Sequence, residues 1–392
     1  MNLRLAFLAL SSLGLAAGGP VLLMSFDGLA AQQFSARTMP RFWKLSQQGQ
    51  RGEGLPAFPS TTFTGHATLA TGCWPDHHGI VANAFIEPGS GLVPYSARAE
   101  YLQREPLWVA ATRSGVRTAV FHWPCATGPW EGVKPWRLEN FQLDTPDRAA
   151  LAFSAAALRD GAQLVMTYLS GTDSPGHYHG PASRQARAQL ARLDAEIAPW
   201  VERMLKRHPD LRVLLLADHG MAKMEHKLDV RPLLGQPSTI LAHGGSAFVY
   251  LTAPLAPGVE AQLTALGLQV NRRQELAANL HLGANPRVGD LVLQAPIGTW
   301  ISQARNAQEA RKELIGRAGA HGYAPEHPEM HTWLVALGTG RTTAIAPAPL
   351  WNIAPTIGHW LGIRWQQEPD GVPIKELTNA APGSAEGPPP GP

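Results

Sequence analysis

Short apolar runs alternate with amphipathic stretches along most of the chain, a pattern typical of α/β proteins. Strands are expected at 20–26, 117–121, 164–169, 213–217 and 333–337. Helices are expected near 41–48, from 62 to about 71, over 182–206 and near 353–361, with Pro199 kinking or splitting the longest of them. Because strands joined through helices run parallel, the pattern predicts a mostly parallel sheet flanked by helices on both faces.

The alternation changes between residues 222 and 320. A strand at 246–251, a helix at 259–266 and a strand at 290–294 are expected there, without further metal-binding candidates at strand ends. We therefore interpret 222–320 as an inserted cap or subdomain. Residues 20–221 and 321–376 then form one core domain.

Both ends of the chain differ in composition from the rest. A basic start, an apolar run over 5–15 and small residues up to Gly19 predict a signal peptide over 1–19 and a secreted or periplasmic protein. An uncleaved anchor is the alternative, but the run is too short to span a bilayer, and so is every later apolar segment. Residues 377–392 are rich in Ala, Pro and Gly, which predicts a disordered tail.

The overall composition excludes several kinds of protein. The net charge of +3 over 392 residues is too small and too evenly spread to indicate nucleic-acid binding. Only two cysteines are present, Cys73 and Cys125, which excludes a disulfide scaffold and a cysteine-rich zinc site. The sequence leaves open whether they form a disulfide or remain two buried thiols.

Polar side chains suited to metal binding follow the central strands. They are Asp27 after 21–26, Asp173 and His177 after 164–169, Asp218 and His219 after 213–217, and His321 before 333–337. Sites in open α/β sheets form where strands end, so these side chains are expected to meet. Three carboxylates and three imidazoles suit two zinc-type sites with open positions. Two such ions clamp both oxygens of a phosphoryl displacement, and the sequence therefore predicts a two-metal hydrolase.

A run of hydroxyl residues precedes the predicted helix at 62–71. A threonine at a helix N-terminus is well placed to meet a phosphate, because free N–H groups and the helix dipole favour anions. Metal coordination would activate such a hydroxyl as a nucleophile. Helix capping by Thr61 and Thr62 is the alternative interpretation, and this stretch alone favours it.

Five motifs, in this order, resemble the nucleotide pyrophosphatase/phosphodiesterase family of the alkaline phosphatase superfamily. They are Asp27-Gly28, the stretch from Phe58-Pro59-Ser60-Thr61-Thr62-Phe63 to Asn83, Asp173-x-x-Gly176-His177-x-x-Gly180-Pro181, Asp218-His219-Gly220-Met221, and His321-Gly322-Tyr323. The resemblance runs from about Pro20 to Glu376, and it implies an alkaline-phosphatase-like fold with an inserted cap. It also implies a phosphodiesterase or nucleotide pyrophosphatase acting on a small-molecule phosphate ester or nucleotide.

The resemblance implies a role for each motif residue. One zinc ion would be held by Asp173, His177 and His321, and a second by Asp27, Asp218 and His219, with Thr62 as a further ligand. Thr62 would be the nucleophile and form a phosphothreonine. Asn83 matches the residue whose amide donates to a phosphoryl oxygen in the transition state.

The resemblance also suggests aromatic contacts with the substrate. Phe63 matches an aromatic residue that contacts the nucleobase or another leaving group in family members. Tyr168 is expected on the same side and Trp136 on the opposite wall, with simple packing as the alternative for all three. His66, His77, His78 and His122 lie near the site in sequence, but the ligand sets do not need them.

The chain departs from the family pattern after Phe63. Thr64-Gly65-His66 replaces the usual Pro-Asn and resembles the phosphate-monoesterase branch of the superfamily. That branch carries a Lys-x-Arg pair after the next strand, whereas this chain has His122-Trp123-Pro124. A monoester carries one more negative charge than a diester, so the missing cations favour a diester. A phosphate monoesterase, a phosphonate hydrolase and a non-catalytic metal-binding protein remain as alternatives.

Overall fold

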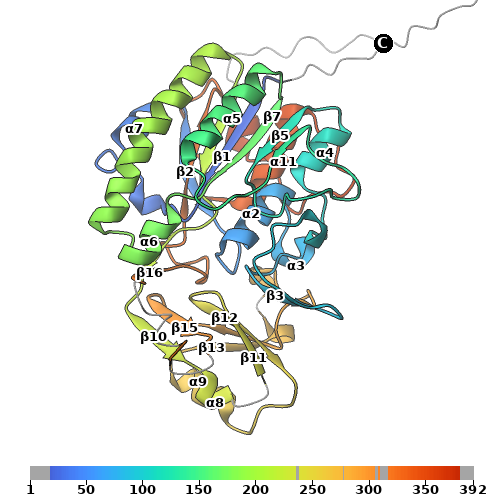
Figure 1. Ribbon diagram of the computed structural model, residues 1–392, viewed down its shortest axis with the longest axis vertical. Coiled ribbons are helices and arrows are strands. Elements are labelled where there is room, and N and C mark those ends of the chain that lie inside the picture. The colour runs from blue at the N-terminus through green and yellow to red at the C-terminus, as the bar shows by residue number, and fades with distance from the viewer. Residues whose placement is uncertain (1–17, 235–237, 277, 305–307, 310–316, 380–392) are drawn as a thin grey trace, which may run out of the picture.

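An eight-stranded sheet forms the middle layer of the protein (Figure 1). The structure, a computed structural model, describes residues 18–234, 238–276, 278–304, 308–309 and 317–379. The sheet has the order β18 (Ala348–Pro349), β2 (Gln50–Leu55), β17 (Thr332–Leu337), β8 (Arg212–Leu216), β1 (Val21–Phe26), β7 (Leu164–Leu169), β5 (Thr118–Phe121), β6 (Arg137–Glu139). β17 runs antiparallel to β2 and β8, whereas the other neighbouring pairs are parallel. The predicted mostly parallel α/β sheet is confirmed.

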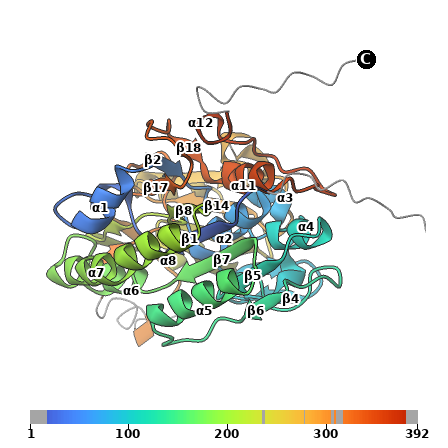
Figure 2. The same ribbon diagram turned by 90° about the horizontal axis from the view of Figure 1, so that it is seen from above.

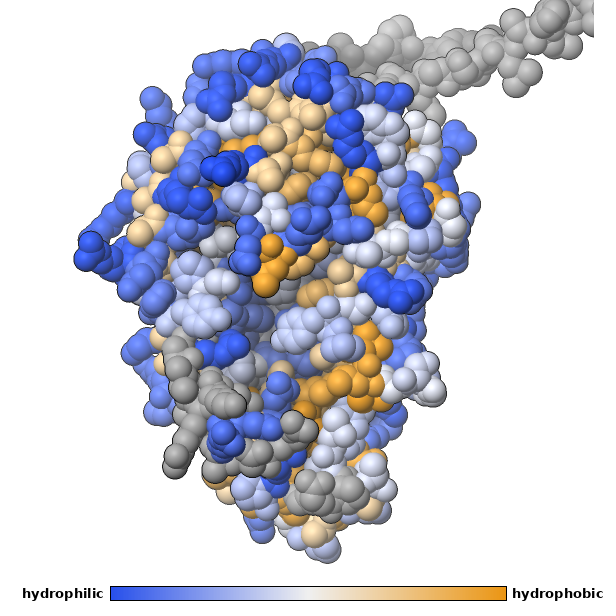
Figure 3. All heavy atoms as spheres, viewed as in Figure 1, coloured by the Kyte–Doolittle hydropathy of each residue, from blue (hydrophilic) through white to orange (hydrophobic). Residues whose placement is uncertain are grey.

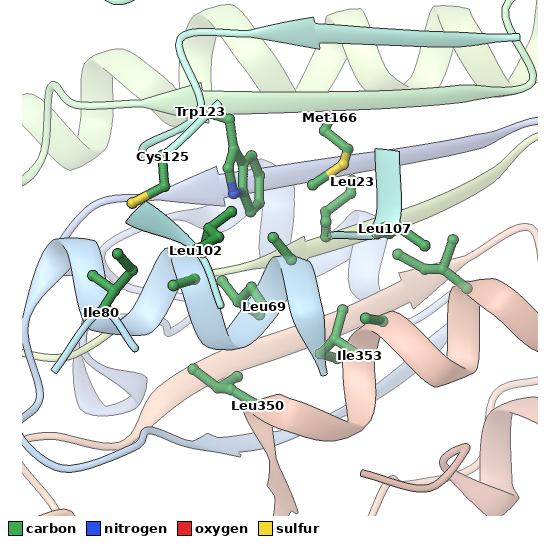
Figure 4. Packing of buried hydrophobic residues seen from close by; sticks show 14 of the residues in the cluster. Leu23, Leu69, Ile80, Leu102, Leu107, Trp123, Cys125, Met166, Leu350 and Ile353 are labelled. Carbon is green, nitrogen blue, oxygen red and sulfur yellow. The ribbon is translucent and has the colours of Figure 1, made fainter. Parts of the chain in front are cut away.

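Helices cover both faces of this sheet, as Figure 2 shows. One face packs against α1 (Pro40–Ser46), α5 (Asp147–Arg159) and α7 (Arg184–Arg207), and the other against α2 (Thr62–Thr71), α4 (Leu107–Arg113) and α11 (Ile353–Leu361). Successive side chains of a strand point to opposite faces, so Leu22 joins the first core and Leu23 the second. In Figure 4 the side chains of Leu23, Leu69 and Ile353 lie in the second core. An apolar run that feeds two cores explains why the central strands are continuously hydrophobic.

Some helices differ from the sequence prediction. α7 is a single helix of 24 residues that runs through Pro199, so of the two expected outcomes, a kink or a split, the split does not occur. The helix buries a long stripe that includes Leu193, Ile197 and Val201, and this packing outweighs the hydrogen bond that proline removes, whose loss costs about 3 kcal/mol. The pattern did not reveal α5, whose buried face has only two large apolar side chains, Leu151 and Leu158, among alanine, serine and aspartate.

The segment between β8 and β17 folds around a sheet of its own, in the lower part of Figure 1. Its four antiparallel strands are β11 (Ser238–Ala242), β12 (Ser246–Leu251), β14 (Leu291–Gln294) and β13 (Gln269–Arg272), and α8 (Arg231–Leu234) and α9 (Val259–Ala265) complete a separate apolar core. β9 (Ala222–Lys223) pairs with β16 (Gly319–Ala320), so the segment leaves and rejoins the core domain at one place. We call residues 222–320 the inserted segment.

The ends of the chain and the cysteines complete the comparison with the sequence. The predicted signal peptide over 1–19 lies almost wholly outside the described residues. The predicted tail begins too early, because α12 (Lys375–Thr378) includes residues 377 and 378; residues 380–392 lie outside the described part. Cys73 and Cys125 are both free and buried.

Among the described residues, no helix has the length and apolar character needed to cross a membrane.

Candidate metal centre and active site

The candidate ligands meet at the carboxyl ends of three adjacent strands. Asp27 follows β1, Asp218 and His219 follow β8, and Asp173 opens α6 (Asp173–His179) a few residues after β7. β8, β1 and β7 lie side by side and parallel, so their ends share one edge of the sheet. Sites of open α/β sheets occur at this edge.

The side chains form two groups of three potential ligands. Asp173, His177 and His321 make one group, and Asp27, Asp218 and His219 make the other, with the ligand atoms of each group within 4.8 Å of one another. The groups adjoin, because the rings of His219 and His321 stack with centroids 3.9 Å apart. Thr62 joins the second group: its Oγ1 lies 3.2 Å from Nε2 of His219 and 3.4 Å from Oδ1 of Asp27. The structure thus brings together all seven residues predicted as ligands.

The three imidazoles are held in the same way by backbone carbonyl groups. Nδ1 of His177 contacts the oxygen of Gly319 at 2.9 Å, Nδ1 of His219 that of Gly220 at 2.8 Å, and Nδ1 of His321 that of Ser60 at 2.9 Å. Since a carbonyl oxygen only accepts, each Nδ1 carries the proton and each Nε2 keeps a lone pair. Metal-binding histidines are oriented in this manner, so the imidazoles fit a metal centre.

The carboxylates also fit a cation. Burial, together with the nearby carboxylates of Asp218 and Asp173, raises the pKa of Asp27 well above its usual range. Oδ1 of Asp173 and Oδ2 of Asp218 are buried without a hydrogen-bond partner in the described part of the chain. Crowded acidic groups of this kind are costly unless a cation compensates them. Mixed carboxylate and imidazole ligands suit zinc better than calcium or magnesium.

Local backbone geometry brings β1 close to its neighbours. Gly28 has a φ of +67°, a conformation that favours glycine, and its N–H donates to Oδ1 of Asp218 at 3.1 Å. Gly65 lets α2 approach the end of β8, because a Cβ atom there would lie 2.8 Å from the backbone oxygen of Asp218. Close packing therefore accounts for Gly65, one of the positions where the chain departs from the family pattern.

Asn83 lies beside the start of α2. Its Oδ1 accepts a hydrogen bond of 2.9 Å from the backbone N–H of Phe63, the residue after Thr62. The carbonyl side of the amide is therefore occupied, and its NH₂ group remains available as a donor. This orientation suits the predicted contact with a phosphoryl oxygen.

His66 has a contact that sequence reasoning did not identify. It is buried, its Nδ1 lies 2.8 Å from the backbone oxygen of Thr62, and the same atom lies 3.3 Å from Oδ2 of Asp218. On a helix, a histidine four residues after Thr62 lies on the same face as Thr62. This spacing was the sequence signal that could have identified His66 as a neighbour of the site. Nδ1 of His66 thus makes its hydrogen bond to Thr62, and the ring lies next to Asp218 without a hydrogen bond to its Oδ2.

A cavity of about 280 Å³ opens beside Thr62. Its lining is mainly aromatic and apolar: Asp27, Thr62, Phe63, Tyr95, Ala97, His122, Pro124, Phe141 and Tyr168. We call this the apolar pocket. Burial lowers the pKa of His122 to about 4, so this imidazole is neutral near pH 7.

The aromatic predictions have different outcomes in this pocket. Phe63 and Tyr168 line it, and the hydroxyl of Tyr168 also donates to Oδ2 of Asp27 at 2.5 Å. Trp136 is not among its lining residues; it is 44 % exposed, and its ring lies 5.0 Å from the Cζ atom of Arg117. Tyr95 and Phe141 contribute aromatic surface instead, and no sequence motif marks either of them.

A second cavity of about 200 Å³ lies on the side of His177 and His321. Its lining residues are Asn83, Tyr95, His177, Ala242, His243, Gly244, Trp300, Gln303, Arg317 and His321. We call this the polar pocket. Six of these ten residues belong to the inserted segment, where sequence reasoning found no functional candidates.

The fold and the arrangement of the site place the chain among the alkaline-phosphatase-like hydrolases. Residues 21–324, well over half of the chain, match the family model described as type I phosphodiesterase / nucleotide pyrophosphatase. The chain belongs to this family, and the resemblance inferred from the sequence motifs is confirmed.

Similar proteins agree with this assignment. An uncharacterised pyrophosphatase/phosphodiesterase of Schizosaccharomyces pombe is 26% identical over 347 residues, which cover 81% of this chain and 71% of the relative. Mouse ectonucleotide pyrophosphatase/phosphodiesterase family member 7 is 25% identical over 362 residues, which cover 85% of this chain and 80% of the relative. A solved structure of murine ectonucleotide pyrophosphatase/phosphodiesterase 5, an inactive variant in complex with AMP, superposes with a TM-score of 0.80 at 21% sequence identity. The match covers 92% of this chain and 99% of the murine chain. At this identity the last similarity establishes the fold.

Proposed function

We propose that this protein is an exported two-zinc phosphodiesterase or nucleotide pyrophosphatase that acts through a phosphothreonine. The observation that carries the proposal is the position of Thr62, whose hydroxyl lies at the N-terminus of α2 and within 3.4 Å of Asp27 and His219. AMP in the solved relative supports a nucleotide as the substrate. The basic and apolar start of the chain supports export by a signal peptide over 1–19.

Two zinc ions would be held by the two ligand groups. Asp173, His177 and His321 would hold one, and Asp27, Asp218 and His219, with Thr62, the other. When bound, the ions supply Lewis-acid stabilisation of anionic oxygens and lower the pKa of coordinated hydroxyl groups and water.

The protein's own residues then account for a two-step displacement. Thr62 releases its proton to water, its Oγ1 forms a bond to phosphorus, and the bond from phosphorus to the leaving oxygen breaks. The NH₂ group of Asn83 and the N-terminal end of the α2 dipole stabilise the charge that develops on the phosphoryl oxygens. Water then attacks the phosphothreonine and restores Thr62.

The charges in the apolar pocket, on the side of Thr62, favour a diester, whereas a cation, Arg317, lines the polar pocket. Among the described residues, no lysine or arginine lines the apolar pocket, and His122, which directly follows β5, is neutral near pH 7. A monoester would bring an additional negative charge without a side-chain partner there, whereas a diester would place an organic substituent against Phe63 and its aromatic neighbours.

Initial rates on bis-p-nitrophenyl phosphate and p-nitrophenyl phosphate test the proposal directly. Zinc-loaded protein at mildly alkaline pH is expected to prefer the diester strongly. Preference for the monoester would assign the chain to the phosphate monoesterases, and phosphate release from phosphonoacetate to the phosphonate hydrolases. Bound zinc without turnover of any of these would contradict an enzymatic function.

A further inference from the structure

Residues 79–101, which we call the Asn83 loop, carry two side chains of the site but have little regular structure of their own. Asn83 lies near the start of the loop, and Tyr95 lines both the apolar and the polar pocket. Between them is a short hairpin of β3 (Phe85–Glu87) and β4 (Gly91–Val93), and most of the remainder is irregular backbone. Such a loop keeps its side chains in place through contacts with its surroundings.

One residue of the inserted segment, Arg287, contacts this loop at both ends and in the middle. Its Nη1 donates to the backbone oxygens of Gly79 at 2.8 Å and Tyr101 at 2.7 Å. Its Nη2 forms an ion pair of 2.5 Å with Glu87, and its Cζ atom lies 4.8 Å from the ring centre of Phe85. Arg287 is buried, and charge-assisted hydrogen bonds are roughly twice as strong as neutral ones, so this side chain fixes the loop firmly.

These contacts bracket Asn83. Gly79 precedes Asn83 and Glu87 follows it at the same separation along the chain, so one guanidinium holds the backbone on both sides. Glycine permits the approach at position 79, because a Cβ atom there would lie 2.7 Å from Nη1 of Arg287. Asn83 donates to a phosphoryl oxygen only while its amide stays in place, and a displacement of about 1 Å can cost about 10²-fold in rate. The position of Arg287 therefore bears on the donor that the proposed reaction uses.

Arg287 is held in turn by the fold of the inserted segment. The hydroxyl of Tyr250, on β12, donates to the backbone oxygen of Arg287 at 2.7 Å and accepts from the N–H of Ile86 in β3 at 3.2 Å. The side chain of Asn285 accepts from the backbone N–H of Arg287 at 3.1 Å and donates to Gln103, just beyond the loop, at 2.8 Å. The inserted segment thus holds the Asn83 loop through a connected polar network.

Apolar packing supports the same junction. One buried cluster joins side chains of the Asn83 loop to side chains of the inserted segment, namely Phe85 and Val93 to Phe248, Val288 and Val292. β3 lies where the core domain meets the inserted segment in Figure 1, and hydrophobic side chains reach the surface at this level in Figure 3. Because close-packed interiors transmit strain, the loop and the inserted segment behave as one unit.

We propose that Arg287 is a positioning residue for Asn83, through which the inserted segment holds the NH₂ donor at the phosphoryl group. This inference rests on the proposed function and gives the inserted segment a part in the chemical step. Arg287 is not among the described residues that line the two pockets, so it acts through the loop rather than on the substrate. Because the donor acts on charge that develops in the transition state, losing its position lowers kcat rather than raising KM.

A double-mutant cycle with Asn83 distinguishes positioning from general support of the fold. On bis-p-nitrophenyl phosphate, Arg287→Ala is expected to lower kcat at least about tenfold and to change KM less than about threefold. In the Asn83→Asp background, where the donor is already absent, the same substitution is expected to lower kcat less than about twofold. A purely structural role would lower kcat by the same factor in both backgrounds.

Two further variants complete the test. Arg287→Lys keeps a positive charge beside Glu87 but lacks the planar fork that reaches both carbonyl oxygens, so its kcat is expected between those of Arg287→Ala and the wild type. It carries the same cycle if Arg287→Ala does not fold. Arg272 also lies on the inserted segment, but it pairs with Glu260 on the exposed surface, so Arg272→Ala is expected to keep the wild-type kcat.

Amide hydrogen exchange adds a measurement that does not depend on turnover. In Arg287→Ala or Arg287→Lys, the amides of the Asn83 loop are expected to exchange at least about tenfold faster than in the wild type, and those of β1 at the wild-type rate. Unchanged exchange in the loop, equal losses of kcat in both backgrounds, or a change confined to KM would overturn this inference and leave the proposed function intact. Wild-type protein that cleaves no diester would overturn the proposed function itself.

Discussion

The carbonyl oxygen of the Asn83 side chain accepts the backbone N–H of Phe63 at 2.9 Å, next to the threonine that begins α2. This bond decides which half of the amide is available to a substrate. Through it, the loop that carries Asn83 is fixed relative to Thr62, although 20 residues separate Asn83 from Phe63.

Asn83→Asp is expected to lower kcat roughly 10²-fold, the usual cost of losing one donor to a developing oxyanion. Aspartate retains an oxygen for the N–H of Phe63, so the start of α2 keeps its position while the NH₂ donor is lost. Steady-state kinetics on bis-p-nitrophenyl phosphate measure the effect. A variant with more than a third of wild-type kcat would show that Asn83 only holds the loop.

Thr62→Ala is expected to abolish nearly all diester turnover while zinc remains bound, because the nucleophilic oxygen is lost and six ligand side chains remain. Turnover and zinc content are measured on the same preparation. Thr61→Ala is the matched control: the hydroxyl of Thr61 donates to Thr64 rather than to the site, and this variant should keep most of its activity. Near-normal turnover by Thr62→Ala would exclude the phosphothreonine.

Tyr168→Phe is expected to weaken zinc binding roughly 10- to 100-fold, because the hydroxyl that holds Oδ2 of Asp27 at 2.5 Å is removed and the ring remains. Competition with a chelator of known affinity measures the change. Tyr250→Phe removes a hydroxyl that donates to the backbone oxygen of Arg287 in the inserted segment, so its zinc affinity should match the wild type. Equal affinities in all three proteins would mean that Tyr168 is only a wall of the apolar pocket.

His78 makes stability depend on pH. Its Nδ1 accepts from the N–H of Ile80 and its Nε2 lies 3.0 Å from the hydroxyl of Thr68, an arrangement for a neutral ring, and burial lowers its pKa from 6.5 to about 3. Between these values the unfolded chain binds a proton that the folded protein excludes. The free energy of unfolding is therefore complete above pH 6.5 and falls as the solution is acidified towards pH 3, by up to about 1.4 kcal/mol per pH unit.

Urea unfolding at pH 7 and pH 5 measures this contribution. His78→Gln is expected to lose less stability over this interval than the wild type, since it removes the titrating ring. His359→Gln changes an exposed histidine on α11 and should behave as the wild type does. Identical losses in His78→Gln and the wild type would show that other groups cause the acid sensitivity.

The sequence was sufficient for the core of the fold and for the residues that form the two groups of candidate metal ligands. The strands at β1, β7 and β8 are buried on both faces, and such runs remain visible without an alignment because nearly every position is apolar. Asp27, Asp218 and His219 are recognisable as candidates because they directly follow buried apolar strands. A charged or polar side chain at such a position is costly unless it has a binding partner. α5 was missed because small and polar side chains alternate with only two leucines on its buried face, which gives a weak apolar stripe.

Only the tertiary structure decided which side chains line the two pockets. Tyr95 and Phe141 come from irregular segments, and Arg317 and Gln303 from a segment with its own core, so no local pattern relates them to Thr62. Trp136 was assigned to a wall from its residue type, but cation–π contacts with Arg117 and Arg137 account for its position. The sequence by itself determined the strands and the chemistry at their ends, because burial and metal binding constrain residue types locally. Only the folded chain decided the pockets, because their walls depend on contacts between segments far apart in sequence.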